Sequence, residues 1–365
     1  METRRPGWRP PHCPNPNCNS HNELDRPWRY KRKGFYTRHC TPHRIRRFTC
    51  LCCGRHFSTQ TFSTSYWQKR PRLLPQMFPL VVGCMANRQI ARALGCSPST
   101  VAHQLARLGR HCILFQSREL AKCPTGDDVV IDGFETFEWS QYFPFHHNVA
   151  VEVDTGYFLY HTDSPLRRKG RMTAHQKRRR EVLEAQHGRP SPCEVQRGMR
   201  ELLGMVTRGN RHITIRSDDH RAYPMAMKEL DCTIAHRITS SKERRDERNP
   251  LWEVNVLDLM IRHSTAAHKR ETIAWAKRRQ VSAEKLTIFQ VWRNYVKRRW
   301  EKGPRESAAM RKGLVRRLLR VEDILRRRLF PWRIDVSERW RDYYERRIET
   351  PALGVNRIHN LTYAF

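Results

Sequence analysis

The chain has 365 residues and carries 70 Lys and Arg against 36 Asp and Glu, a formal net charge of +34, which favours a phosphate-rich partner because cations that neutralise phosphates release counterions. A hydrophobic fraction of 38% argues against bulk disorder. No run approaches the length of a transmembrane helix and the chain starts without the apolar core of a signal peptide, so we expect a cytoplasmic protein with no membrane partner.

Six of the twelve cysteines lie between Cys13 and Cys53. Without a signal peptide, metal ligation or simple burial explains them better than disulfides do. Cys13 and Cys18 form one knuckle and Cys50 and Cys53 a second, and two such turns present four thiolates to one tetrahedral Zn²⁺. The metal would stabilise a domain too small for a large core. We therefore predict a small β zinc ribbon with one structural zinc over residues 1–64; buried cysteines without metal are the alternative. Spare ligands are available at His21, His39, Cys40, His43 and Cys52.

Residues 72–122 change in character and predict helices. Gly95 is suited to end a first helix, and Ser97 to cap a second that has Pro98 at its first position. Helix, glycine turn and capped helix is the pattern of a helix-turn-helix DNA-binding domain. A plain helical hairpin within a core is the alternative. The side chains expected to face a major groove are Ser99, Thr100, His103, Gln104 and Arg107.

Two apolar runs end at an aspartate, one at Asp132 and one at Asp218. They belong to five predicted strands, at 129–132, 147–154, 157–162, 212–218 and 233–239, with helical stretches before and after the fourth. This is the order of an α/β ribonuclease-H-like fold, in which the first and fourth strands are neighbours. Paired carboxylates suit Mg²⁺ or Mn²⁺, and two ions about 4 Å apart support in-line phosphoryl transfer. Either aspartate alone could cap a turn, and Asp219 is an alternative to Asp218.

A third carboxylate is expected on the next helix, where Glu253, Asp258 and Glu271 compete. We favour Asp258, because with Asn255 and Arg262 it forms a polar stripe between apolar residues, and a buried polar stripe needs a reason. Glu253 follows closely, with Glu271 behind it.

Two further basic stretches stand out. The charge run Lys169–Arg180 predicts a helix surface that faces solvent or DNA. Residues 281–365 predict a basic helical C-terminal region, with Arg316-Arg317 and Arg326–Arg328 on an amphipathic helix. Its arginines are suited to grip phosphates, although a solvated helix face is equally consistent with them.

Several segments resemble bacterial insertion-sequence transposases of the DDE/DDD type with an N-terminal zinc ribbon and helix-turn-helix. Ser217–Tyr223 resembles the second-acid segment of that family, Arg262–Arg278 its basic helix after the third acid, and Val291–Lys297 the helix that follows. The resemblance covers most of the chain. It departs from the usual glutamate-asparagine signature at the third acid.

The resemblance implies an Mg²⁺-dependent DNA transposase, a polynucleotidyl transferase in which Asp132 and Asp218 are catalytic and Asp258 is our choice of third acid. It implies binding to the inverted-repeat ends of a mobile element, cleavage there, strand transfer into target DNA, and assembly as a homo-oligomer on double-stranded DNA at the nucleoid. In residues 262–278, Arg262, Lys269 and Arg270 would contact DNA. The catalytic domain would span 123–280.

Two other functions fit the same pattern less well. One is a DNA-binding regulator derived from a transposase, with an inactive nuclease-like domain. The other is a protein that binds or cleaves RNA. Two intact acids favour the enzyme, because a binding module has no need of carboxylates that face a nucleic acid.

Overall fold

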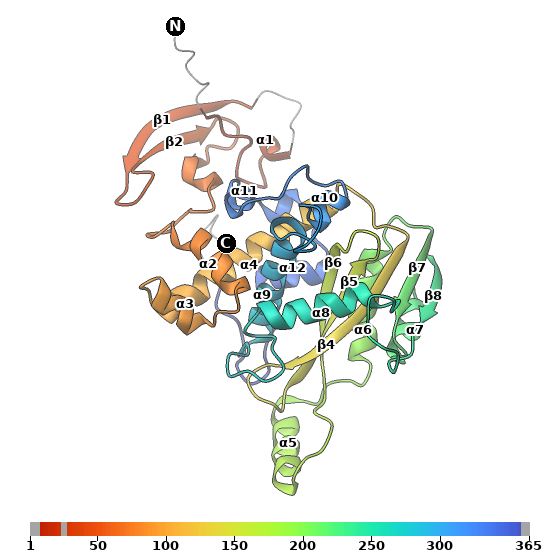
Figure 1. Cartoon of the computed structure of the whole chain (residues 1–365). Helices are drawn as coiled ribbons and strands as arrows, with labels where there is room; N and C mark the ends of the chain where they lie inside the picture. Colours follow the sequence, from red (N-terminus) through yellow and green to blue (C-terminus); the bar gives the residue numbers. More distant parts are fainter. Residues whose placement is uncertain (1–7, 23–27, 359–365) are drawn as a thin grey trace.

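The computed structural model describes residues 8–22 and 28–358 (Figure 1). Its N-terminal part is a three-stranded antiparallel sheet of β1 (Tyr30–Thr37), β2 (Arg44–Cys50) and β3 (His56–Ser58), with a short α1 (Asn19–Asn22) before it and a 3₁₀ turn, η1 (Thr59–Phe62), after it. The core of this unit is small and aromatic: the rings of Phe48 and Phe57 stack with centroids 5.3 Å apart.

Three helices follow, α2 (Leu73–Val82), α3 (Asn87–Ala93) and α4 (Pro98–Leu120). The predicted turn between α3 and α4 is present, because Gly95 has a φ of +56° and the Ser97 hydroxyl accepts a hydrogen bond of 3.2 Å from the Thr100 N–H. The helix α4 is 23 residues long. Its second half is buried, which makes it part of the core and not a free recognition helix.

The main sheet has five strands, in the order β6-β5-β4-β7-β8. They are β4 (Asp128–Phe137), β5 (Pro144–Glu152), β6 (Phe158–Pro165), β7 (His212–Ser217) and β8 (Thr233–Ile238). The first three are antiparallel, and β7 and β8 run parallel to β4. The prediction that the first and fourth strands are neighbours is therefore confirmed.

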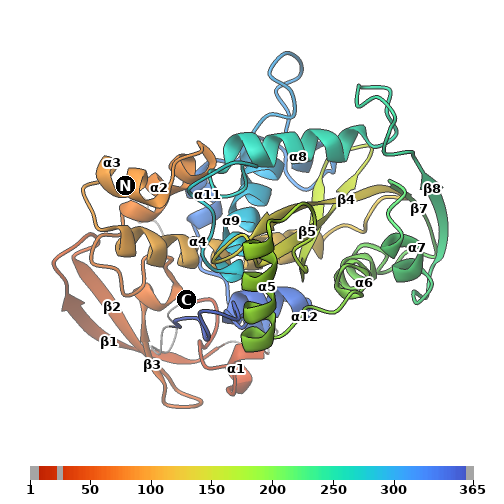
Figure 2. The same cartoon turned by 90° about the horizontal axis from the view of Figure 1, so that it is seen from below.

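Helices cover both faces of this sheet (Figure 2). Alternate residues of a strand face opposite sides, and Val129 and Ile131 of β4 belong to the core that includes α6 (Glu194–Val206). Val130 and Phe134 belong to a second core beneath α8 (Trp252–Ser264). The remaining helices flanking the sheet are α5 (Ala174–His187), α7 (Ala222–Met227) and α9 (Arg279–Val291).

Three expectations about the elements are wrong. The segment Arg262–Arg278, which resembles a basic helix in sequence, is helical only to Ser264, and 265–278 form no helix. The strand β4 does not end at Asp132 but continues to Phe137, because β5 pairs with it along its whole length. The C-terminal region is not helical throughout: residues 312–320 form no helix, and Arg317 pairs with Asp323. The short elements there are a π-helical turn, η2 (Trp292–Val296), α10 (Ala308–Arg311), α11 (Val321–Leu325), a 3₁₀ turn, η3 (Pro331–Arg333), and α12 (Glu338–Glu345).

No helix in the described part of the chain is long and apolar enough to cross a membrane.

Buried histidines join the sheet to α9. The Ser282 hydroxyl lies 2.8 Å from Nε2 of both His147 and His268, and His161 Nε2 lies 2.9 Å from the Thr287 hydroxyl. Burial lowers the pKa of His147 to about 4 and that of His161 to about 3. These rings are therefore neutral in the folded protein near pH 6.

The folded protein should consequently lose stability in mild acid through these rings. Between about pH 6.5 and pH 4 the unfolded chain protonates His147 and the folded chain does not, so each pH unit lost costs about 1.4 kcal/mol for this ring. We expect His147→Gln to remove one proton from the pH slope of the unfolding free energy, measured by urea unfolding across that range. The exposed His212 supplies the control, since His212→Gln should leave the slope unchanged. Equal slopes for both variants would contradict this origin of acid lability.

Candidate functional site

The pairing of β4 with β7 brings two carboxylates together. The last residues in register are Val130 and Arg216. Asp132 lies two positions further along β4, and Asp218 lies two positions further along the chain, just past the end of β7. Asp132 has the same parity as Val130, so its side chain faces α8. Burial, and then the charges of Asp218 and Asp258, raise the pKa of Asp132 to about 7. Three acids therefore act on one another at this edge of the sheet.

The third of these acids comes from α8. Asp258 accepts hydrogen bonds of 3.1 and 3.0 Å from Arg262 Nε through its two oxygens. The same guanidinium lies 5.4 Å from the ring centroid of Phe134 on β4, which holds this turn of α8 over the carboxyl half of the strand. Arg262, expected to contact DNA, is half-buried and holds Asp258 instead.

The competing acids lie elsewhere. Glu253 forms an ion pair of 2.5 Å with Arg299 and lies beside Gly156 in the β5–β6 turn, at the opposite end of β4 from the two aspartates. Glu271 is exposed in the irregular segment after α8. Asp219 is exposed and its carboxylate lies 3.4 Å from the Ser241 hydroxyl. Of the acids that competed in the sequence, Asp258 is the one whose charge, like that of Asp218, raises the pKa of Asp132.

The structure also adds residues to this site that the sequence argument missed. A Cβ on Gly133 would lie 2.1 Å from His146 Cε1, so this glycine lets the His146 ring lie against β4, on the face opposite the Asp132 side chain. His220 stacks on His146, with ring centroids 6.5 Å apart, and burial lowers the pKa of His146 to about 4. Arg245 lowers the pKa of Asp132 from the β8–α8 segment. Gly133, directly after Asp132, was the feature of the sequence that could have indicated a close neighbour such as His146.

The residues expected to face DNA differ in how far they are exposed. Ser99 and His103 are exposed on α4, and Thr100 and Gln104 are half-buried. Arg107 is a correction: it is buried, and its guanidinium donates a hydrogen bond of 2.8 Å to the Tyr66 carbonyl oxygen. This occurs because α4 enters the core at that turn. Two further cations, Lys269 and Arg270, are exposed in the segment after α8.

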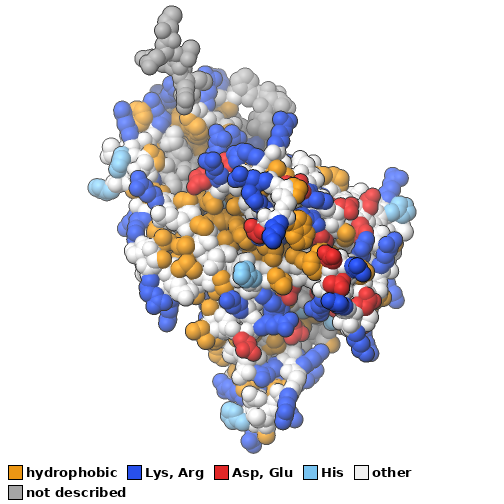
Figure 3. Space-filling view, viewed as in Figure 1, with side chains coloured by type: hydrophobic (Ala, Val, Ile, Leu, Met, Phe, Trp, Pro, Cys, Tyr) orange, Lys and Arg blue, Asp and Glu red, His pale blue; other side chains and the backbone are white. Residues whose placement is uncertain are grey.

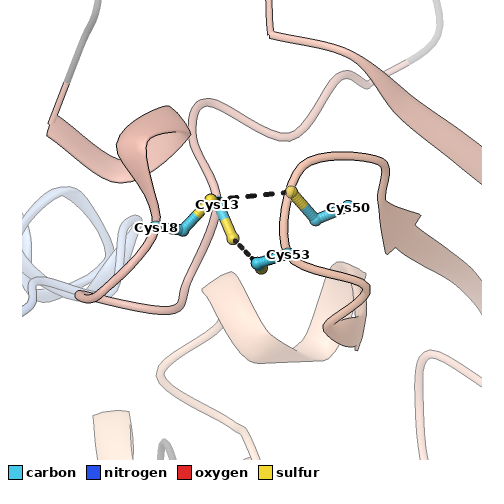
Figure 4. A group of neighbouring side chains, drawn as sticks. All are labelled: Cys13, Cys18, Cys50 and Cys53. Atoms are coloured by element: carbon cyan, nitrogen blue, oxygen red, sulfur yellow. Dashed lines mark hydrogen bonds between the residues drawn. The ribbon is translucent and has the colours of Figure 1, made fainter.

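The four predicted zinc ligands lie together (Figure 4). The ligand atoms of Cys13, Cys18, Cys50 and Cys53 all fall within 4.8 Å of one another. The sulfur of Cys13 is 3.7 Å from that of Cys53, and the sulfur of Cys18 is 3.8 Å from that of Cys50. Such spacing suits the tetrahedral sulfur shell of a zinc ion, so this cluster could hold one.

Surrounding groups support that use of the cysteines. The indole N–H of Trp28 donates to the Cys50 sulfur at 3.4 Å. Burial alone raises the pKa of the Cys50 thiol, but the Cys53 backbone N–H and the Trp28 indole bring it down to about 7, and donors of this kind orient and stabilise a metal-bound thiolate. His21, one of the spare ligands, instead places Nδ1 2.5 Å from the carbonyl oxygen of Cys13.

Comparison with known proteins gives little beyond the geometry. No protein-family model and no curated protein matches the chain. A solved structure with a matching chain is the cryoEM structure of the simian T-cell lymphotropic virus intasome in complex with PP2A regulatory subunit B56 gamma. The match has 10% sequence identity and a TM-score of 0.24, and covers 62% of this chain and 70% of that chain.

The cysteine cluster predicts a stoichiometric metal. We expect one zinc per chain in protein purified without chelator. The variant Cys50→Ser should lose this zinc, and its N-terminal unit should unfold at a lower temperature, because the metal contributes directly to folding. Metal analysis by mass spectrometry and thermal unfolding measure both. Cys52→Ser is the matched control, because Cys52 is exposed and lies outside the cluster. Wild-type protein without zinc would contradict the assignment.

The carboxylates predict a pH-dependent affinity for Mg²⁺. Below the raised pKa of Asp132, about 7, a metal must displace a proton, so its affinity should rise up to about tenfold per pH unit and level off above that pKa. Isothermal titration calorimetry between about pH 6 and pH 8 measures the effect. Asp132→Asn should weaken binding and remove the pH dependence, while Glu271→Gln should change neither. An affinity independent of pH in the wild type would contradict Asp132 as a ligand.

Proposed function

We propose that this protein is a metal-dependent DNA transposase, a polynucleotidyl transferase with a ribonuclease-H-like catalytic domain. One observation supports the proposal: Asp132 and Asp218 each follow the last paired residues of two parallel strands by two positions, and the charges of Asp218 and of Asp258 on α8 raise the pKa of Asp132, in a chain of net charge +34. Three neighbouring carboxylates repel one another, and bound cations would offset this repulsion. A phosphodiester is the substrate that both features serve.

The surroundings of the acids are suited to a polyanion. The segment between β8 and α8 carries exposed Lys242, Arg244, Arg245 and Arg248, and Arg245 is close enough to Asp132 to lower its pKa. These cations attract the nucleic-acid backbone toward the acidic edge. The acids themselves repel a phosphate, so metal binding is what makes its approach favourable.

The donor set fits Mg²⁺ or Mn²⁺, which prefer carboxylate oxygens. When bound, such ions activate a water or a 3′-hydroxyl and stabilise the leaving oxygen of an in-line displacement. Asp132 must lose its proton to accept a cation. Arg262, one turn further along α8 than Asp258, keeps the Asp258 carboxylate oriented toward β4. His146, neutral and buried, packs against Gly133 on the opposite face of the sheet.

The remaining parts of the chain have proposed roles in delivering DNA. We assign recognition of the inverted-repeat ends of an element to the zinc ribbon and to α3 and α4, where Ser99, Thr100, His103 and Gln104 stay available. The exposed Lys269 and Arg270 would contact DNA near α8. Strand transfer joins two DNA segments, so we also propose assembly as a homo-oligomer on double-stranded DNA.

The decisive experiment separates binding from chemistry. Asp132→Asn and Asp218→Asn should each abolish Mg²⁺- or Mn²⁺-dependent nicking of supercoiled plasmid while DNA affinity stays within about twofold of wild type. The reason is that each removes a metal ligand but adds no charge that repels DNA. Gel-resolved nicking and fluorescence anisotropy measure the two properties.

Asp219→Asn is the matched control, since it removes an adjacent but exposed aspartate. It should retain nicking. Asp258→Asn should behave like the two strand variants, and Glu253→Gln should retain nicking if it folds. Wild-type protein that binds DNA tightly and shows no metal-dependent nicking would favour a DNA-binding regulator instead.

A further inference from the structure

The helix α5 stands away from the rest of the molecule. It projects from the bottom of the body in Figure 1, away from the zinc ribbon, and it lies in front of the body in the view from below in Figure 2. The helix α5 follows β6, and the last residue of β6, Pro165, pairs with Phe145 on β5. The first residue of β5, Pro144, pairs in turn with Phe137, the last residue of β4. The helix therefore leaves the sheet at the end toward which β4 and β7 run, five positions beyond Asp132 along β4.

The contacts of α5 with the body lie toward its C-terminal end, where the His187 ring packs against Phe143 and Trp139 with centroids 5.8 and 6.2 Å apart. Leu183 is its one buried residue. Arg167 donates two hydrogen bonds to Glu184, of 2.8 and 3.0 Å, and Arg180 donates one of 3.3 Å to the Arg168 carbonyl oxygen. These bonds use the only acid on the inner side of the helix. Arg168 lies over the Tyr142 ring, 5.1 Å from its centroid.

Five cations of this segment have no ion-pair or side-chain hydrogen-bond partner within the described residues 8–22 and 28–358, and all five are exposed: Lys169, Arg171, Lys177, Arg178 and Arg179. Figure 3 shows blue side chains along the lower projection that α5 forms in Figure 1. Three of the five are consecutive, and consecutive helical positions point in different directions around the axis. The projection therefore presents cations on several sides.

This arrangement is unfavourable for an isolated helix. Positive charges are disfavoured toward the N-terminal end of a helix, and α5 has no acid in its first turn to offset Lys177 and Arg178. Helices of about 14 residues that bury little surface are marginal in water. The Thr173 cap, which accepts a 3.2 Å hydrogen bond from the Gln176 N–H, offsets part of this cost. A polyanion against the helix would offset the rest.

We infer that α5 is a phosphate-binding arm that binds the double-stranded DNA segment on which Asp132 and Asp218 act. This segment is separate from the DNA bound by α3, α4 and the ribbon. The inference rests on the proposed function and names the part of the chain that holds the DNA on which the acids act. A B-DNA major groove about 12 Å wide admits a single helix. Cations on several sides of α5 then reach phosphates on both walls of that groove.

The test compares two charge-matched variants. Arg178→Gln with Arg179→Gln removes two charges from α5. Arg211→Gln with Lys228→Gln removes two exposed charges from the segments before β7 and β8, at the opposite edge of the sheet. Affinity for a fluorescein-labelled linear duplex of mixed sequence is measured at several salt concentrations, and nicking of supercoiled plasmid with Mn²⁺ is measured on the same preparations.

We expect the α5 variant to lower the slope of log affinity against log salt by about two, because each lost phosphate contact removes about 0.9. Its nicking rate should fall about tenfold at low DNA concentration. The rate should recover as the DNA concentration is raised, because the substitutions weaken binding but leave the catalytic acids unchanged. The control variant should match wild type in both. Circular dichroism establishes that α5 variants keep their helical content.

The outcomes separate the two proposals. If wild-type protein nicks plasmid and the α5 variant matches the control in salt slope and rate, the arm is overturned while the enzyme stands. If wild-type protein neither nicks nor binds the duplex, the proposed function itself fails. Preferential loss of single-stranded RNA binding in the α5 variant, with duplex DNA binding unchanged, would also overturn the arm.

Discussion

The parallel pairing of β4 with β7 is the contact on which the rest of the site depends. Backbone hydrogen bonds from Asp128–Val130 to Thr214–Arg216 fix the register, and that register leaves Asp132 and Asp218 adjacent just beyond the last pair. Two like charges would separate if they were on mobile segments. The sheet prevents this, and burial, with the charges of Asp218 and Asp258 adding to it, raises the pKa of Asp132 to about 7.

The helices that surround this pair are fixed to it through α9. Gln290 and Asn294 donate hydrogen bonds of 3.0 and 2.9 Å to the Phe158 carbonyl oxygen on β6. On the other side of α9, a Cβ at Gly109 of α4 would lie 2.7 Å from Glu284 Cβ, so a glycine is needed for α4 to approach this closely. The long helix α4 thus carries the region after the Gly95 turn into the same core as the sheet.

Charge is arranged in layers around the acids. Arginines that lie inside the molecule hold acids and backbone oxygens: Arg262 holds Asp258, and Arg299 holds Glu253. Cations without acidic partners gather at the rim, on the β8–α8 segment and on α5. This division explains how so basic a chain folds, because the buried cations are neutralised internally and the repulsion among the others is relieved in solvent or by a polyanion.

Local chemistry in the sequence determined much of this molecule. The cap at Ser97, the glycine turn at Gly95, the paired cysteine knuckles and the alternating strands each depend on neighbouring residues, so they could be predicted. Tertiary packing decided the rest. Glu253 and Asp258 share one helix, and only the packing of α8 turns Asp258 toward Asp132 while Arg299, distant in sequence, binds Glu253. The continuation of β4 past Asp132 and the burial of Arg107 likewise depend on β5 and on Tyr66, partners that no local pattern specifies.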